Sequence, residues 1–78
     1  MATLRLFAAA REAAGTGRVE IGEATVGAVL AAAEARYGEA FSAVLGTCRV
    51  WVNGEPATLD QPVSSQDEVA VLPPVSGG

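Results

Sequence analysis

One segment of this chain is long and regular enough for a complete helix, and it stands among short segments that alternate in the manner of strands. Between residues 26 and 37 the apolar side chains fall on a single helical stripe: Val26, Val29, Leu30, Ala33 and Tyr37. Thr25 precedes the stripe as a capping residue, and Gly38 ends it. A single helix must bury its stripe against another element, so the strands are expected to form a sheet that packs on it.

Five short segments are predicted to supply the strands. Residues 3–7 (TLRLF), 18–21 (RVEI), 49–52 (RVWV) and 68–72 (EVAVL) have the period of two that is typical of a half-buried strand. Residues 49–52 run into Asn53-Gly54, a dipeptide that favours a tight hairpin, so residues 55–59 are expected to return as another strand. Pro56 restricts that strand to the edge of the sheet, because proline has no backbone N–H to donate.

The order of these elements predicts an α+β domain. Residues 8–15 are expected to form a short helical turn that ends at Gly15, and the apolar residues 41–46 are ambiguous, with one further helical turn as an option. A right-handed crossover would place the last strand parallel to the first in the middle of the sheet. The predicted fold is therefore the β-grasp, or ubiquitin-like, fold: a mixed sheet of about five strands with one main helix on one face. It covers residues 1–72 and leaves residues 73–78 as an extended tail.

The alternation of the strands also predicts which face meets a partner. The side chains expected to face the helix are Leu4, Leu6, Val50, Val52, Val69 and Val71. The opposite face then carries Arg5, Phe7, Arg49, Trp51, Ala70 and Leu72. Exposed aromatic, leucine and arginine side chains are enriched at protein interfaces, so Phe7, Trp51 and Leu72 are candidate partner-binding residues. Leu59 is a further candidate, although the loop around it is also a candidate to cover this apolar face.

Composition and charge exclude several classes of function. The formal charge of −4, from nine acidic residues against five arginines, argues against binding to nucleic acid or to an anionic membrane. The chain has no histidine, the commonest general base and metal ligand, and no glycine-rich nucleotide-binding motif. Its one cysteine, Cys48, has no partner for a disulfide or a metal site, and we expect it to be a small buried hydrophobe. We expect neither a bound cofactor nor a self-sufficient catalyst.

The expected location is the cytoplasm. A single cysteine suits a reducing compartment. The sequence has no charged segment followed by an apolar stretch of the kind that forms a signal peptide, and no apolar run long enough to cross a membrane.

The last six residues, PPVSGG, have the properties of a reactive tail. Pro73 and Pro74 favour an extended path away from the domain. Six extended residues reach about 20 Å, which is enough to enter the active site of another protein. Gly77 and Gly78 have no Cβ, so they can pass through a narrow channel and leave the terminal carboxyl group open to attack. Activation of that carboxyl group with ATP and attack by a sulfur nucleophile would give a thiocarboxylate.

The whole chain resembles the small subunit of molybdopterin synthase, a ubiquitin-like sulfur carrier. The resemblance rests on LRLFAAAREAAG near the start, VWVNGEPA in the middle and, most specifically, DEVAVLPPVSGG at the end. It implies that an E1-like adenylyltransferase uses ATP to adenylate Gly78 and that a sulfurtransferase supplies the sulfur of a thiocarboxylate. It further implies that the tail, with Pro73, Pro74 and Val75, inserts into the large subunit and donates sulfur for the dithiolene of molybdopterin.

Three other functions remain open. The chain could carry sulfur for another pathway, such as thiamine or amino-acid synthesis. It could be a ubiquitin-like modifier that joins Gly78 to lysines of other proteins. It could also be an interaction domain whose tail does no chemistry. The tail sequence PPVSGG favours the molybdopterin function over another sulfur-carrying pathway. A terminal Gly-Gly alone would be a weak indication, because ubiquitin-like modifiers and the sulfur carriers of the thiamine pathway share it.

Overall fold

The structure is a computed structural model and describes residues 1–74. In chain order its elements are β1 (Ala2–Leu6), α1 (Ala8–Ala14), β2 (Arg18–Ile21), α2 (Val26–Tyr37), α3 (Glu39–Leu45), β3 (Arg49–Val52), β4 (Glu55–Pro56) and β5 (Glu68–Leu72). The strands form one five-stranded sheet in the order β2-β1-β5-β3-β4. The central strands β1 and β5 are parallel, and the other three pairs are antiparallel. This mixed sheet has the predicted β-grasp topology.

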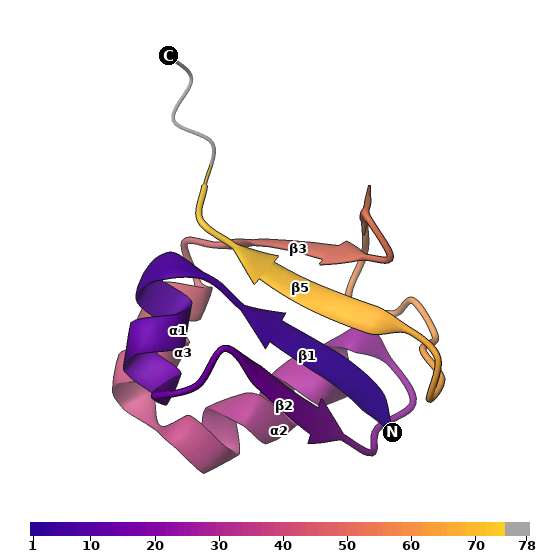
Figure 1. Ribbon diagram of the computed structural model, residues 1–78, viewed down its shortest axis with the longest axis horizontal. Coiled ribbons are helices and arrows are strands. Elements are labelled where there is room, and N and C mark those ends of the chain that lie inside the picture. Colours follow the sequence, from indigo (N-terminus) through magenta and orange to yellow (C-terminus); the bar gives the residue numbers. More distant parts are fainter. Residues whose placement is uncertain (75–78) are drawn as a thin grey trace.

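The helices lie on one side of the sheet (Figure 1). Helix α2 passes behind β1 and β2 in this view, and α1 and α3 lie side by side at one end of the sheet. The core is formed by the inward side chains of β1 and β5 together with the stripe of α2. Leu4, Leu6, Val69 and Val71 are fully buried, as the alternation predicts, and so are Val26, Val29 and Ala33 of α2. In β3, Val52 is buried and Val50 is half-buried.

Helix α2 begins and ends where the sequence predicts. Thr25 has an extended backbone, and its side-chain oxygen accepts a hydrogen bond from the backbone N–H of Ala28 at 3.1 Å. This bond satisfies one of the backbone donors that the first turn of a helix leaves unpaired. Gly38 closes the helix with a φ of 88°, a value that residues with a Cβ rarely adopt. Within residues 1–74, no helix combines the length and the hydrophobicity needed to cross a membrane.

The hairpin after β3 also forms as predicted. Asn53 and Gly54 both have positive φ, at 51° and 84°, which is the backbone pattern of the tight turn that joins two antiparallel strands. The returning strand is shorter than expected, since β4 contains only Glu55 and Pro56 rather than residues 55–59. Pro56 cannot donate to the ladder, but the backbone N–H of Ala57 still donates to the carbonyl oxygen of Val50 on β3 at 3.1 Å. The chain then reaches α2, where the carbonyl oxygen of Leu59 accepts from the backbone N–H of Gly27.

Two further segments differ from the prediction. The ambiguous residues 41–46 belong to a complete helix, α3, whose Phe41 is fully buried. The Phe41 ring packs against Tyr37 with 5.4 Å between ring centroids. Strand β1 ends at Leu6 rather than at Phe7, and Phe7 is instead the extended residue that precedes α1. The helix formed by residues 39–45 places Phe41 in the core, a contact that the sequence pattern does not reveal.

Candidate functional site

The face of the sheet that the helices leave uncovered is the candidate site. Its side chains come from the outward positions of the strands, which alternate with the buried ones. Arg5 on β1, Ala70 and Leu72 on β5 and Trp51 on β3 are all half-buried, whereas their neighbours Leu4, Val69, Val71 and Val52 are in the core. The predicted division of the two faces is therefore confirmed for β1, β3 and β5.

Strand register places five outward residues in one row across the sheet. Arg18 on β2 is opposite Arg5 on β1, and Arg5 is in register with Ala70 on β5. Ala70 is opposite Trp51 on β3, and Trp51 is opposite Pro56 on β4. The row thus changes from two arginines at one side to tryptophan and proline at the other, with a small alanine between them. We refer to these two sides as the arginine half and the apolar half of the open face.

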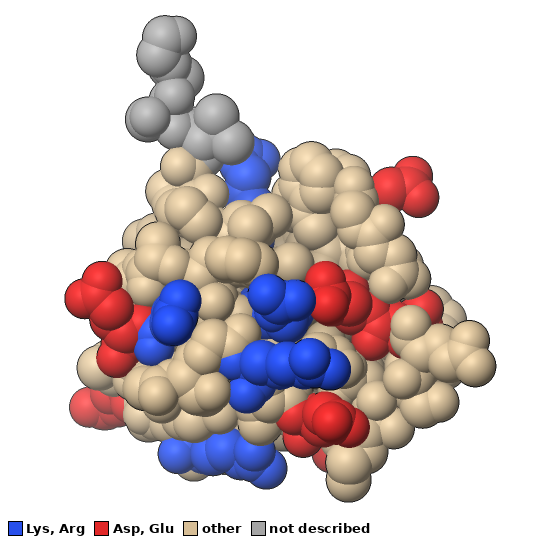
Figure 2. All heavy atoms as spheres, viewed as in Figure 1, with Lys and Arg blue, Asp and Glu red and all other residues tan. Residues whose placement is uncertain are grey.

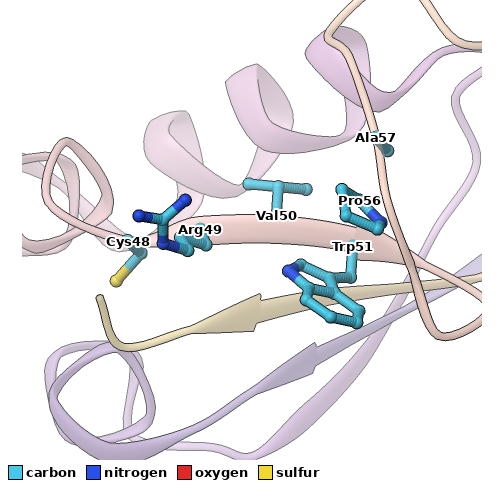
Figure 3. Close-up of a pocket in the computed structure, with 6 residues that line it drawn as sticks. All are labelled: Cys48, Arg49, Val50, Trp51, Pro56 and Ala57. Atoms are coloured by element: carbon cyan, nitrogen blue, oxygen red, sulfur yellow. The ribbon is translucent and has the colours of Figure 1, made fainter. Parts of the chain in front are cut away.

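The apolar half includes a shallow depression beside β3 and β4. It is lined by Cys48, Arg49, Val50, Trp51, Pro56 and Ala57. Figure 3 shows Trp51 and Val50 on opposite sides of β3, with Pro56 and Ala57 on the segment that returns beside it. Leu72 is opposite Arg49 in the next row of the sheet. A half-buried indole with leucine and proline nearby offers apolar area that another protein can cover.

The arginine half is held together by contacts of Arg5. One guanidinium nitrogen of Arg5, Nη1, lies 3.4 Å from Oε2 of Glu68, and the two side chains are partly exposed. An exposed pair of this kind stabilises a fold by about 0–1 kcal/mol. The Arg5 guanidinium carbon lies 5.6 Å from the centroid of the Phe7 ring, within the range of a cation–π contact. Figure 2 shows basic side chains gathered on this face, with acidic side chains beside and around them.

The structure brings most of the candidate partner-binding residues of the described chain to one face but separates one. Phe7 is 36% exposed and borders the arginine half, whereas Trp51 and Leu72 belong to the apolar half. Leu59 is 62% exposed, but it lies on the helix side. Its carbonyl oxygen accepts a hydrogen bond from the backbone N–H of Gly27 at 2.7 Å. Its side chain lines a depression there with Leu30 and Leu45. The loop around Leu59 therefore does not cover the open face.

The chain leaves the sheet at the end of β5. Leu72 is the last residue of that strand, and Pro73 and Pro74 after it are exposed. Strand β5 is central in the sheet, and its outward side chains belong to the open face. The chain therefore leaves the sheet at one end of that face (Figure 1). The predicted site residues Val75, Gly77 and Gly78 lie outside the described residues.

A network of hydrogen bonds at the opposite end of β5 ties the hairpin to the loop before that strand. Asp67 accepts from the side-chain amide of Asn53 at 2.8 Å and from the backbone N–H of Ser64 at 2.7 Å. Asn53 in turn accepts from the backbone N–H of Glu68 at 2.9 Å. The bond from Asn53, and then that from Ser64, hold the pKa of the Asp67 carboxyl group below its ordinary value, because both stabilise the carboxylate.

No group of three or more His, Cys, Asp or Glu side chains in residues 1–74 is placed to hold a metal ion. Cys48 is half-buried and packs against the core rather than within it, and its thiol donates to the carbonyl oxygen of Val44 at 3.2 Å. The open face presents apolar area and guanidinium groups beside the strand that leads into the tail.

Sequence reasoning missed three residues of this face: Arg11, Arg18 and Pro56. The alternation of β2 could have placed Arg18 on a sheet face, but not opposite Arg5, because register between strands is a tertiary property. Arg11 lies on α1, and the chain folds back after Gly15 so that Gly17 and Arg18 come near it. Its side chain lies beside Gly17, where a Cβ would be 3.3 Å from Arg11 Nε.

Known proteins are similar to this chain in sequence and in fold. The ThiS family matches residues 4–78. Small archaeal modifier protein 1 of Haloferax volcanii is 40% identical over 84 residues, which cover 95% of this chain and 97% of that protein. The solution structure of small archaeal modifier protein 1 from Methanosarcina acetivorans has a TM-score of 0.87 at 29% identity, covering 99% of this chain and 95% of that chain. A Pyrococcus furiosus protein assigned as molybdopterin converting factor, subunit 1, has a TM-score of 0.80 at 26% identity, covering 95% and 97%.

These matches extend over nearly the whole chain and agree with the β-grasp topology of its sheet. They also agree with the resemblance that the beginning, middle and end of the sequence indicate. The chain therefore belongs to the ThiS family and is a ubiquitin-like protein of the sulfur carrier and modifier class.

Proposed function

We propose that this chain is the sulfur carrier subunit of molybdopterin synthase and that it works in the cytoplasm. Gly78 is the residue that carries the sulfur, and Gly77 gives it the freedom to enter a narrow active site. An E1-like adenylyltransferase, a sulfurtransferase and the large subunit of the synthase are its protein partners. The likeness to the Pyrococcus furiosus protein assigned as molybdopterin converting factor, subunit 1, supports this choice among sulfur-carrying pathways.

The proposed chemistry uses only the carboxyl group of Gly78. The carboxylate attacks the α-phosphorus of ATP, pyrophosphate leaves, and the product is an acyl adenylate. A sulfide-equivalent nucleophile from the sulfurtransferase then attacks the carbonyl carbon and displaces AMP, which leaves a thiocarboxylate. ATP is a substrate of the activating enzyme and is not bound by this chain. No side chain of the carrier has to move a proton in these steps, which suits a chain without histidine.

The observation that carries the proposal is the junction between β5 and the tail. Strand β5 is a central strand, and it ends at Leu72 beside the open face. Pro73 and Pro74 are exposed immediately after it, and proline restricts the backbone to extended conformations. A partner that covers the open face would therefore receive the tail from a fixed point. In this arrangement Phe7, Trp51 and Leu72 hold the body of the carrier, and Pro73, Pro74 and Val75 lead Gly78 into the active site.

Leu59 has a different part in the proposal. Because it lies on the helix side of the sheet, it contacts the large subunit only where that subunit extends around the β3–β4 edge. We therefore assign the centre of the interface to the open face and its periphery to Leu59.

Mass spectrometry of the intact chain tests the proposal. Incubation with ATP, the activating enzyme and a sulfur source should raise the mass of the chain by the difference between sulfur and oxygen. The charged carrier should then convert cyclic pyranopterin monophosphate to molybdopterin when the large subunit is added. Deletion of Gly78, or addition of one residue after it, should abolish both reactions and leave the circular dichroism spectrum unchanged. A deletion variant that still forms molybdopterin would refute the assignment of Gly78.

Modification of other proteins is a second candidate function, favoured by the 40% identity to small archaeal modifier protein 1. It uses the same activated Gly78, but the acceptor is the amine of a lysine on a target protein instead of sulfur. The same mass spectrometry separates the two functions. Isopeptide-linked peptides that end in Gly78, recovered from cells that express the chain, would establish a modifier. A thiocarboxylate without such adducts would establish a sulfur carrier.

A further inference from the structure

The arginine half of the open face contains a depression that neither the fold nor the proposed chemistry explains. It is lined by Arg5, Leu6, Phe7, Arg11, Thr16, Gly17 and Arg18. Three of the five arginines of an acidic chain thus surround one hollow. They come from β1, α1 and β2, so the tertiary structure rather than a run of basic sequence brings them together.

This arrangement is unfavourable for the isolated domain. Arg5 and Arg18 are directly opposite each other on neighbouring antiparallel strands, and like charges in that position repel. Glu68 is the one carboxylate within ion-pair distance of these arginines among residues 1–74, and it contacts only Arg5. The Nε atom of Arg5 is buried and has no hydrogen-bond partner among the same residues. The rest of the Arg5 side chain is partly exposed, and Arg11 and Arg18 are exposed, so the hollow offers guanidinium donors and positive charge to a ligand.

The chemistry of these groups indicates carboxylates. Guanidinium groups bind carboxylates through paired, charge-assisted hydrogen bonds, and several guanidiniums around one hollow can bind more than one carboxylate. The hollow is also continuous with a surface suited to protein contact. Phe7 lines it, and the row Arg5, Ala70, Trp51 leads directly into the apolar half. A ligand that covers both halves has apolar area as well as negative charge, which describes a protein segment better than a small anion.

We propose that the Arg5–Arg11–Arg18 depression is the docking point for an acidic segment, rich in Asp and Glu, of the protein that receives the tail. This inference rests on the proposed function, because it names the chemistry of the surface that meets the carrier. It predicts two contact regions with different physical character. The apolar half provides buried area, and the arginine depression provides orientation and a binding rate that falls as salt is added.

A short acidic peptide tests the depression without any partner enzyme. Hexaglutamate is titrated into the full-length, isotopically labelled chain, and backbone amide shifts are followed by nuclear magnetic resonance. We expect saturable shifts at Arg5, Gly17 and Arg18, and Arg18→Glu should weaken the binding about tenfold, equivalent to about 1.4 kcal/mol. Arg36→Glu is the matched control, since it makes the same change of charge at an exposed position of α2 on the helix side.

The stability of the same variant separates a docking role from a structural one. Arg18→Glu replaces a like-charged pair with Arg5 by an oppositely charged pair, so its thermal unfolding midpoint should be unchanged or higher than that of the wild type. Weaker binding together with equal or greater stability is the expected signature. Hexaglutamate shifts that are absent, or equal in Arg18→Glu and Arg36→Glu, would overturn the proposal. Inorganic pyrophosphate that binds the hollow as tightly as hexaglutamate would also overturn it, in favour of a small-anion site.

The outcome is distinguishable from that of the proposed function. Formation of the thiocarboxylate is read by mass, whereas the depression is read by peptide binding. A chain that binds hexaglutamate at these arginines but never gains sulfur would refute the proposed function and leave the docking surface standing. A chain that gains sulfur normally but has no peptide-dependent shifts would do the reverse.

Discussion

Phe7 and Asp67 are two single residues that decide how the candidate site is presented. Phe7 is the extended residue between β1 and α1, and its ring lies beside the guanidinium group of Arg5. Ala8 follows it with a φ of 52°, a conformation that costs a residue with a Cβ roughly 1–2 kcal/mol. Asp67 acts at the other end of the sheet, where its hydrogen bonds join the β3–β4 hairpin to β5. Both residues are fixed by contacts that the linear sequence does not reveal.

The lowered pKa of Asp67 makes part of the stability depend on pH. Because the carboxylate has a lower pKa in the folded chain than the ordinary value of 3.8, its contribution is fully present above that value. The contribution is lost as the pH falls below 3.8 and through the folded-state pKa. Urea unfolding of the wild type and of Asp67→Asn should therefore differ most near neutral pH and converge in strong acid. A difference that stays constant over this range would show that Asp67 acts through its shape rather than through its charge.

Helix α3 is the element that sequence patterns describe least well, and it supplies a fully buried aromatic side chain to the core. Its one buried residue, Phe41, contacts Tyr37 of α2 through their rings. Ser42 of α3 also donates a hydrogen bond to Glu34 of α2 at 2.8 Å. Helices α1 and α3 lie against each other, so α3 supports the helix that follows Phe7. The shape of one end of the open face thus depends on a helix on the other side of the sheet.

Removal of the Phe41 ring should therefore destabilise the whole domain. Phe41→Ala leaves a cavity in the core and should cost about 3–5 kcal/mol, a large part of the stability of a domain of this size. Val44→Ala is the matched control on the same helix, because Val44 is half-buried and the change removes fewer buried atoms. Denaturant unfolding followed by circular dichroism measures both variants. Equal losses in the two would mean that the α3 ring is not part of a close-packed core.

The whole molecule divides into a supporting layer and a binding layer. The helices and the inward side chains form the core, and the outward side chains of the same strands form the open face. Since the tail starts from the end of that face, docking and delivery are combined in a sheet of five short strands. The arginine half and the apolar half are two regions of one surface, and the tail begins beyond its end. Substitutions on the face and changes to the tail can therefore be tested separately.

Truncation of the open face should weaken the complex without unfolding the carrier. Phe7→Ala combined with Leu72→Ala removes partly exposed side chains, and we expect affinity for the large subunit to fall at least about tenfold. Arg36→Ala is the control, because Arg36 is exposed on α2, on the helix side of the sheet, and has no part in the proposed interface. Calorimetry measures the two dissociation constants, and thermal unfolding confirms that both variants fold. An unchanged dissociation constant for the double variant would show that the large subunit binds elsewhere.

The features that the sequence predicts correctly depend on local chemistry. The stripe and caps of α2, the Asn53-Gly54 hairpin and the alternation of β1 and β5 each depend on neighbours a few residues apart. Together with the order of elements, they predicted the α+β class, the β-grasp topology and the division of the sheet into two faces. The conformations around Phe41 and Phe7 are harder to predict from sequence. A short apolar run has the same pattern in a helix as in a buried strand, and the last residue of a strand looks like the residue that precedes a helix.

The set of residues that meet on the open face depends on tertiary structure. Register set Arg18 against Arg5 and Trp51 against Ala70 and Pro56, and a shift of one residue would have sent each side chain to the other face. In the folded chain Leu59 lies on the helix side of the sheet, and Arg11 lies beside Gly17. The reason is physical: alternation tells which side chains share a strand face, but contacts between strands are formed by residues far apart in the chain, whose pairing only the packed core selects.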